Sequence, residues 1–178
     1  LDQLPHLELT REIVRRFNFL YKKEVFPEPD AMLTKTSKLL GTDGRKMSKS
    51  YGNAIYLSDS RDEVKQKLST MFTDPQRLRR TDPGDPEVCA IFTMHKLYSP
   101  EVEVEEIDRE CRKAGIGCVD CKKRLIVRLN DALEPIREKR AGYAADKKGV
   151  KQIVADATEK ARGIAMKTME EVREAVGI

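Results

Sequence analysis

Aromatic side chains are scarce in this chain of 178 residues: they make up 6% of it, and tryptophan is absent. Charged residues, in contrast, make up 36%. A β-sandwich draws its core largely from aromatic and β-branched side chains, so this composition argues against one. The mixture favours a highly solvated, helical protein.

Long hydrophobic runs are also missing. No stretch approaches the roughly 20 apolar residues that a membrane-spanning helix needs, and nothing at the beginning resembles a signal peptide. We therefore expect a cytoplasmic protein with no membrane partner. The net charge of +4 is mild and is compatible with a polyanionic partner.

The chain has no methionine at its start. It opens at Leu1 with a loop that leads directly into a helical pattern. A natural protein rarely begins in this way, so we expect the front of a larger protein to be missing.

Hydrophobic periodicity predicts helices over most of the chain. The helical patterns cover residues 7–23, 61–72, 88–97, 104–112, 121–140 and 147–176. Ser60 and Glu63 form a capping-box pattern, and Pro135 should kink the fifth helix. Residues 31–34 could form a short buried strand, and the long apolar stripe of the last helix is typical of a helical bundle. A domain boundary is expected within residues 58–86.

One basic segment has the composition of a phosphate-binding loop. It reads Lys46-Met47-Ser48-Lys49-Ser50, and glycines precede and follow it. Glycine tolerates unusual backbone shapes, lysine supplies a point charge, and serine hydroxyls can donate to phosphate oxygens. Such a loop could stabilise charge on a polyphosphate under attack. A solvated basic loop is the alternative that the residues alone leave open.

All four cysteines fall between residues 89 and 121. They are Cys89, Cys111, Cys118 and Cys121, with the spacing C-x21-C-x6-C-x2-C. In a charged cytosolic chain such clustering points to metal or redox chemistry before disulfides. Neighbouring lysines and arginines should favour thiolates. Four thiolates on one centre would suit zinc or an iron–sulfur cluster, and free core cysteines or a redox C-x-x-C are the alternatives.

Three patterns resemble one family. The literal KMSKS at 46–50 resembles the signature of class I aminoacyl-tRNA synthetases. The stretch D-Q-x-x-H-x-E-x-T-R at 2–11, with R-F-N at 16–18, resembles tryptophanyl-tRNA synthetases. The cysteines resemble the C-x22-C-x6-C-x2-C of a bacterial subset that holds a [4Fe-4S] cluster in its anticodon-binding domain. The first interval is one residue shorter here, which leaves zinc open.

The resemblance implies the C-terminal portion of a bacterial tryptophan enzyme. Its fold would be mainly α, with the end of a Rossmann-type α/β catalytic domain in residues 1–58. A helical-bundle anticodon-binding domain would follow in residues 59–178. The intact enzyme would use ATP and Mg2+ to activate tryptophan, would transfer it to tRNA(Trp), and would be a homodimer.

The resemblance also assigns roles to residues. In the ATP site, Asp2 would reach the ribose and Leu39 would touch adenine. Gln3 would face the amino and carboxylate groups of tryptophan. Lys46 and Lys49 would be the catalytic residues, with Lys49 acting on the triphosphate in the transition state. The remaining ATP-binding residues would be Met47, Ser48 and Ser50. The metal ligands would be Cys89, Cys111, Cys118 and Cys121.

Two alternatives remain at this point. One is the sister enzyme for tyrosine, which shares KMSKS but matches neither the cysteine pattern nor the D-Q string. The other is a tRNA-binding iron–sulfur module without catalysis. The chain alone should be inactive, because the amino-acid pocket and the first ATP-binding motif are not in it. Six cations are candidates for tRNA phosphate contacts or for a merely solvated surface: Arg77, Arg79, Arg80, Lys122, Lys123 and Arg124.

Overall fold

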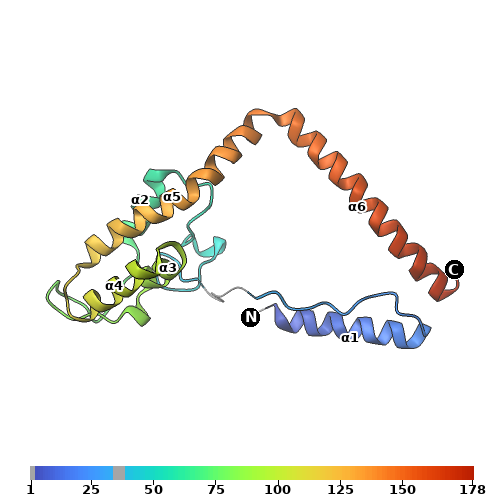
Figure 1. The fold of residues 1–178 in the computed structure, drawn as a ribbon, viewed down its shortest axis with the longest axis horizontal. Helices are drawn as coiled ribbons and strands as arrows, with labels where there is room; N and C mark the ends of the chain where they lie inside the picture. The colour runs from blue at the N-terminus through green and yellow to red at the C-terminus, as the bar shows by residue number, and fades with distance from the viewer. Residues whose placement is uncertain (1–2, 34–38) are drawn as a thin grey trace. The chain divides into compact units, whose positions relative to one another are not determined.

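The computed structural model describes residues 3–33 and 39–178. The chain divides into two compact units, one comprising Leu1–Ser37 with Ala145–Ile178 and the other comprising Lys38–Ala144. Helices dominate both units (Figure 1). In the described residues the only β pairing is an isolated bridge between Leu40 and Lys46. The expectation of a mainly α fold is therefore confirmed.

The first unit begins with α1 (Leu4–Tyr21). Pro5 lies in its first turn, where the missing N–H costs no hydrogen bond, and the helix starts three residues before the expected Leu7. After α1 the chain runs back beside the helix in an extended form (Figure 1). The ring of Phe17 packs edge-on against Phe26 at 5.0 Å between centroids, and the Asn18 amide donates to the Phe26 carbonyl at 2.8 Å.

The short strand expected at residues 31–34 is wrong for the part that the structure describes. Ala31, Met32 and Leu33 have no regular secondary structure and are exposed, while Thr34 lies outside the described residues. A strand requires a neighbouring strand for its backbone hydrogen bonds, and none of the described residues pairs with this segment.

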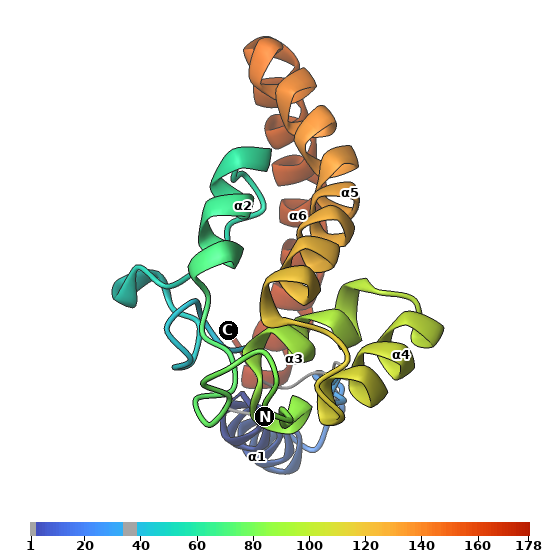
Figure 2. The same cartoon turned by 90° about the vertical axis from the view of Figure 1, so that its left-hand side faces the viewer.

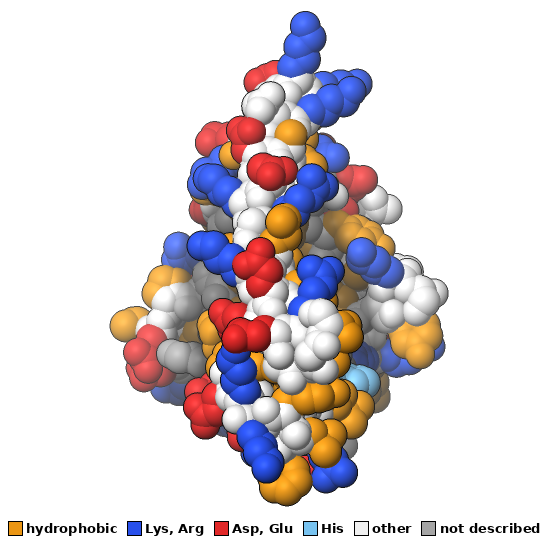
Figure 3. Space-filling view, turned by 90° about the vertical axis from the view of Figure 1, so that its right-hand side faces the viewer, with side chains coloured by type: hydrophobic (Ala, Val, Ile, Leu, Met, Phe, Trp, Pro, Cys, Tyr) orange, Lys and Arg blue, Asp and Glu red, His pale blue; other side chains and the backbone are white. Residues whose placement is uncertain are grey.

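Helix α6 (Lys147–Val176) occurs at the predicted residues. The Asp146 carboxylate caps it by accepting from the Gly149 N–H at 2.8 Å, and Gly177 ends it with a positive φ of 84°. The apolar stripe of α6 is typical of a helical bundle, yet no residue of α6 is buried; Ile164, for example, is 70% exposed. Figure 3 shows charged side chains of both signs with exposed hydrophobic ones between them. A side chain is buried only where another surface packs against it. The contact of α6 with the segment after α1 includes an exposed ion pair between Glu174 and Lys23, the residue after the C-cap of α1.

In residues 39–144, the described part of the second unit, four α-helices follow one another and share one core. They are α2 (Arg61–Thr70), α3 (Ala90–Tyr98), α4 (Glu101–Arg112) and α5 (Cys118–Ala145). Two short 3-10 turns accompany them, Lys49–Tyr51 and Pro86–Val88. Figure 2 shows α5 running beside α2, with α3 and α4 near its first turns. The core side chains include Val64, Leu68, Ile91, Ile107, Leu125 and Leu129.

The local signals in this unit act as expected. Ser60 Oγ accepts from the Glu63 N–H at 3.2 Å, and the Glu63 carboxylate accepts from the Ser60 N–H at 2.7 Å, which confirms the capping box. Helix α5 is longer than the predicted 121–140 and continues through Pro135 to Ala145.

In the part of the chain that the structure describes, no helix combines the length and the apolar character needed to cross a membrane.

Candidate functional site

The KMSKS segment, residues 46–50, closes a tight turn. The Gly41 N–H donates to the Arg45 carbonyl at 2.7 Å, and the Met47 N–H donates to the Leu39 carbonyl at 2.9 Å. Gly44 sits in the turn with φ of +80°, where a side chain would be strained. A Cβ there would also come within 2.8 Å of the Phe72 ring, so glycine is required on two counts.

Asn53 organises this loop, although no motif in the sequence points to it. Its amide nitrogen donates to Asp43 Oδ1 at 2.7 Å and to the Lys46 carbonyl at 3.2 Å. Its amide oxygen accepts from the Ser48 N–H at 2.8 Å. Asn53 is only 3% exposed. These partners therefore supply the hydrogen bonds that a buried amide can no longer form with water. Gly41 leaves the room for this side chain, since a Cβ at that position would collide with the Asn53 amide.

Some charged side chains of the loop are paired with one another by these contacts. The Asn53 amide and the Arg45 guanidinium, which lies 2.7 Å from Asp43 Oδ2, lower the pKa of Asp43 to about 2. Arg45 is thereby paired, and it also stacks over Tyr51 at 4.8 Å. Lys46 pairs with Leu40 in the isolated β-bridge, Lys49 begins the 3-10 turn that follows, and both lysines are exposed. An incoming phosphate would meet these two lysines and the paired hydroxyls of Ser48 and Ser50, 2.8 Å apart.

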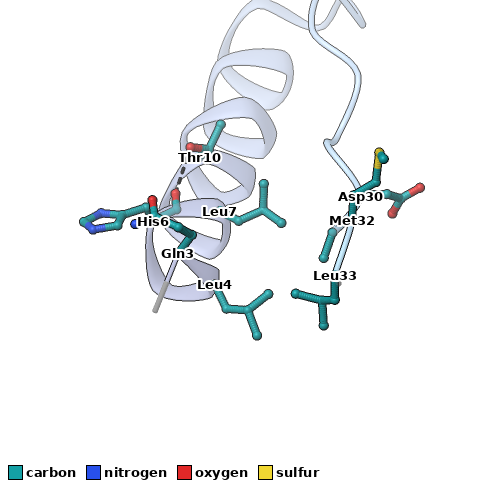
Figure 4. A pocket seen from close by; sticks show the side chains of 9 residues that line it. Gln3, Leu4, His6, Leu7, Thr10, Asp30, Met32 and Leu33 are labelled. Carbon is teal, nitrogen blue, oxygen red and sulfur yellow. Dashed lines mark hydrogen bonds between the residues drawn. The ribbon is translucent and has the colours of Figure 1, made fainter. Parts of the chain in front are cut away.

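The N-terminal residues with predicted roles lie in the first unit. Asp2 lies outside the described residues. Gln3 takes the N-cap position of α1, but its side chain makes no capping hydrogen bond. Gln3 lines an open groove of about 340 Å³ together with Leu4, Leu7, Thr10 and Leu33, among others (Figure 4). The His6 ring points away from the extended segment in this view.

The four cysteines lie together. Cys89 precedes α3, Cys111 lies in the last turn of α4, and Cys118 and Cys121 occupy the first turn of α5. All four are free thiols and line one cavity, whose other walls include Ile91, Phe92, Ile107 and Ile116. A Cβ on Gly84 would come within 2.7 Å of Cys111 Sγ, so the chain passes this site as closely as glycine permits.

Burial governs the protonation of these thiols. It raises the pKa of Cys89 and of Cys111, and burial together with the other three cysteines raises that of Cys121 to about 12. Arg77 favours the thiolate of Cys111 and Arg124 favours that of Cys121, as expected of basic neighbours, but burial outweighs both cations. Lys113, Lys123 and Arg124 are paired with Glu110, Asp120 and Glu106. Ligation at this site requires that a metal displace protons.

No three or more His, Cys, Asp or Glu side chains in residues 3–33 and 39–178 converge as ligands of a single metal ion. Four thiolates on one zinc ion would lie within about 4 Å of one another, given Zn–S bonds of about 2.3 Å. A [4Fe-4S] cluster instead binds each thiolate through a different iron, so its ligands stand further apart.

The six candidate RNA-binding cations differ in their surroundings. Lys122 donates to the Ser69 carbonyl at 2.9 Å, and burial lowers its pKa. Arg124 and Lys123 have acidic partners. Arg79 and Arg80 are exposed, and in the described part of the chain neither has an ion pair. They line a hollow of about 280 Å³ with Leu78, Val119 and Asp120, among others.

Comparison with known proteins gives a consistent result. A family model described as class I tRNA synthetases (W and Y) matches residues 1–134. The chain is 53% identical to the tryptophan–tRNA ligase of Aquifex aeolicus, over 99% of this chain and 45% of that protein. It is 50% identical to the tryptophan–tRNA ligase of Thermotoga maritima, over 99% of this chain and 54% of that protein.

A solved structure has the same fold. It is a tryptophanyl-tRNA synthetase from Campylobacter jejuni complexed with ADP and tryptophan. Its TM-score is 0.76 at 32% identity, and the match covers 99% of this chain and 55% of the other. The chain thus spans about half the length of the relatives that it matches.

Proposed function

Because the chain belongs to the family of class I tRNA synthetases for tryptophan and tyrosine, we propose that it is the C-terminal portion of a tryptophan–tRNA ligase. The observation that carries this proposal is the 53% identity to a tryptophan–tRNA ligase over nearly the whole chain. The curated relatives named for tryptophan favour this substrate over tyrosine. Residues 1–58 would end the Rossmann-type catalytic domain, and residues 59–178 would form the anticodon-binding domain.

The complete enzyme would catalyse two steps. The carboxylate of tryptophan attacks the α-phosphate of Mg2+-bound ATP, forming tryptophanyl-AMP and releasing pyrophosphate. The 3′-terminal ribose of tRNA(Trp) then takes the tryptophanyl group and AMP leaves. We place the enzyme in the cytoplasm, as a homodimer, where tRNA is charged for protein synthesis.

The KMSKS loop would act in the first step. Lys46 and Lys49 are both exposed, so their charges would reach the triphosphate and stabilise charge that develops on the leaving pyrophosphate. Met47, Ser48 and Ser50 would complete the contacts to ATP. Leu39, whose carbonyl already accepts from Met47, would contact adenine. Asp2 would bind the ribose and Gln3 would bind tryptophan.

Lys49→Ala tests the loop in the product of the complete gene. We expect the rate of tryptophan-dependent ATP–pyrophosphate exchange to fall about 100-fold or more, with a much smaller change in tryptophan affinity, because the charge acts mainly in the transition state. Lys151→Ala on the exposed face of α6 is the matched control and should leave the rate unchanged. Equal losses of rate and tryptophan affinity in Lys49→Ala would contradict the role given to Lys49.

We further propose that Cys89, Cys111, Cys118 and Cys121 hold a [4Fe-4S] cluster. The supporting observations are the four free thiols around one cavity and the spacing of the four cysteines in the sequence. When bound, the cluster would supply a structural cross-link between the starts of α3 and α5 and the end of α4. Zinc is the alternative metal.

Anaerobic purification tests the metal. The protein should be brown, with iron and sulfide in equal amounts and broad visible absorption, and Cys111→Ala should remove most of the iron. A colourless protein that contains one zinc ion would mean that the site holds zinc and not a cluster. Four freely titrating thiols with no metal would eliminate the site.

A further inference from the structure

Arg77 lies between the four cysteines and the turn that carries Arg79 and Arg80. One terminal nitrogen, Nη1, is 3.7 Å from Cys111 Sγ and 3.9 Å from Cys118 Sγ. The other, Nη2, donates to the Arg80 carbonyl at 2.9 Å and to the Ile116 carbonyl at 2.8 Å. A single half-buried guanidinium thus contacts two of the proposed ligands and the carbonyls of Arg80 and Ile116.

We propose that Arg77 is a positioning residue for the iron–sulfur cluster, and that it ties the arginine-bearing turn, residues 77–82, to the cluster. This inference rests on the cluster proposed above. Through Nη1 it donates N–H···S hydrogen bonds to the thiolates of Cys111 and Cys118. Through Nη2 it holds the carbonyls of Arg80 and Ile116.

The electrostatics of the site favour this role. A cluster with four thiolate ligands carries net negative charge, and reduction by one electron adds to it. A fixed cation at the sulfurs stabilises the reduced state more than the oxidised one and therefore raises the reduction potential. Elsewhere in residues 3–33 and 39–178 no lysine or arginine donates to a cysteine sulfur; Lys122, for example, donates to the Ser69 carbonyl.

The shape of arginine is also required. A guanidinium is planar and presents its donors in a fixed fork, whereas an ammonium group is a point charge. Lysine at this position would keep the positive charge but would not reach two sulfurs and two carbonyls together. Arg77→Lys therefore keeps the positive charge but loses the fixed geometry of the guanidinium donors, and Arg77→Met removes both the charge and the donors.

The experiment uses the product of the complete gene, purified without oxygen, and four proteins: the unchanged protein, Arg77→Met, Arg77→Lys and Arg109→Met. Arg109 is the matched control, because it is exposed, lies two residues from Cys111 and pairs with Glu110. The readouts are the iron content, the midpoint potential in a dithionite titration, the half-life of the visible absorption in air, and the rate of trypsin cleavage after Arg79 and Arg80.

We expect Arg77→Met to shift the midpoint to lower potential, to shorten the half-life several-fold and to speed cleavage in the turn. Arg77→Lys should restore much of the potential but not the protection of the turn, and Arg109→Met should match the unchanged protein. If Arg77→Met fails to assemble a cluster, the test rests on Arg77→Lys, provided that its iron content is normal. Its midpoint potential and its rate of trypsin cleavage then show whether Arg77 has the proposed role. An unaltered potential and cleavage rate in loaded Arg77 variants would overturn this inference and leave the cluster standing. Colourless unchanged protein would overturn both.

Discussion

At the scale of single residues, the side chain of Asn53 decides the shape of the KMSKS loop. It is buried, and it bonds to Asp43, to the Lys46 carbonyl and to the Ser48 N–H. The two lysines with proposed catalytic roles therefore project from a backbone that one amide holds. An interaction that acts through the loop in this way should affect the rate more than substrate binding.

Asn53→Ala should lower the rate of ATP–pyrophosphate exchange about tenfold in the product of the complete gene, with less than about a twofold change in the KM for tryptophan. Steady-state kinetics measure both constants. Asn130→Ala is the control, because Asn130 is similarly buried but bonds to Arg61 and Arg137 instead of the loop. If both variants lose the same activity, general destabilisation accounts for the loss.

The same substitution should change the titration of Asp43. Its pKa of about 2 depends first on the hydrogen bond from Asn53, so Asn53→Ala should raise that pKa toward the ordinary 3.8. The sign follows from linkage: a depressed carboxyl pKa adds stability that is complete above pH 3.8 and is lost as the pH falls through about 2. Carbon-detected NMR of the Asp43 carboxyl gives the pKa. An unchanged value would mean that Arg45 alone lowers it.

At the scale of elements, Arg137 joins α5 to the segment before α2. Its guanidinium donates to the Asp59 carbonyl at 2.7 Å and to Asn130 Oδ1 at 2.8 Å, and its side chain is only 15% exposed. The first of these hydrogen bonds spans 78 residues of sequence. Both compensate polar groups that would otherwise be buried without partners.

Arg137→Leu should therefore lower the free energy of local opening by about 1–3 kcal/mol, which is the cost of leaving buried acceptors without donors. Hydrogen exchange should quicken in residues 57–62 and in the middle of α5. Arg128→Leu removes an exposed arginine that pairs with Glu103, and its effect should stay below about 1 kcal/mol. Slow exchange in Arg137→Leu would show that apolar packing alone fixes the two elements.

At the scale of the whole molecule, tRNA binding should depend on the exposed arginines of one turn. Arg79 and Arg80 have no ion pair in the described part of the chain, whereas Lys122, Lys123 and Arg124 are already engaged. Each lysine or arginine that binds a phosphate steepens the dependence of log K on log salt by roughly 0.7–0.9.

The double variant Arg79→Gln with Arg80→Gln should make that slope shallower by roughly one to two. Fluorescence anisotropy with tRNA(Trp) across a salt series measures it. The control removes the same charge from α4, in Arg109→Gln with Arg112→Gln, where both arginines pair with acidic neighbours. Equal slopes in both double variants would mean that net charge, and not this turn, governs binding.

The 178-residue chain alone should show no tryptophan-dependent ATP–pyrophosphate exchange, because it spans about half the length of the tryptophan–tRNA ligases that it matches. Radiolabelled pyrophosphate incorporation measures the activity, and the product of the complete gene is the positive control. Exchange by the short chain would contradict the proposal that it is only a portion of the enzyme.

The sequence by itself determined the features that depend on neighbours along the chain. Apolar periodicity located the helices, and Ser60 with Glu63 located the start of α2, because these signals act within one or two helical turns. The KMSKS string and the spacing of the cysteines were also readable, since the chemical types of the side chains are sufficient to recognise them. Domain limits and residue roles taken from the resemblance stay predictions.

Only the tertiary structure decided which of these side chains meet and how far water is excluded. Asn53 was overlooked because its partners are defined by a turn and not by spacing. Basic neighbours were expected to favour thiolates, but burial outweighs them and raises the pKa of Cys89, Cys111 and Cys121. The apolar stripe of α6 is typical of a helical bundle, yet no residue of that helix is buried. Burial and contacts between distant residues depend on the surface opposite each side chain, and a local pattern does not specify that surface.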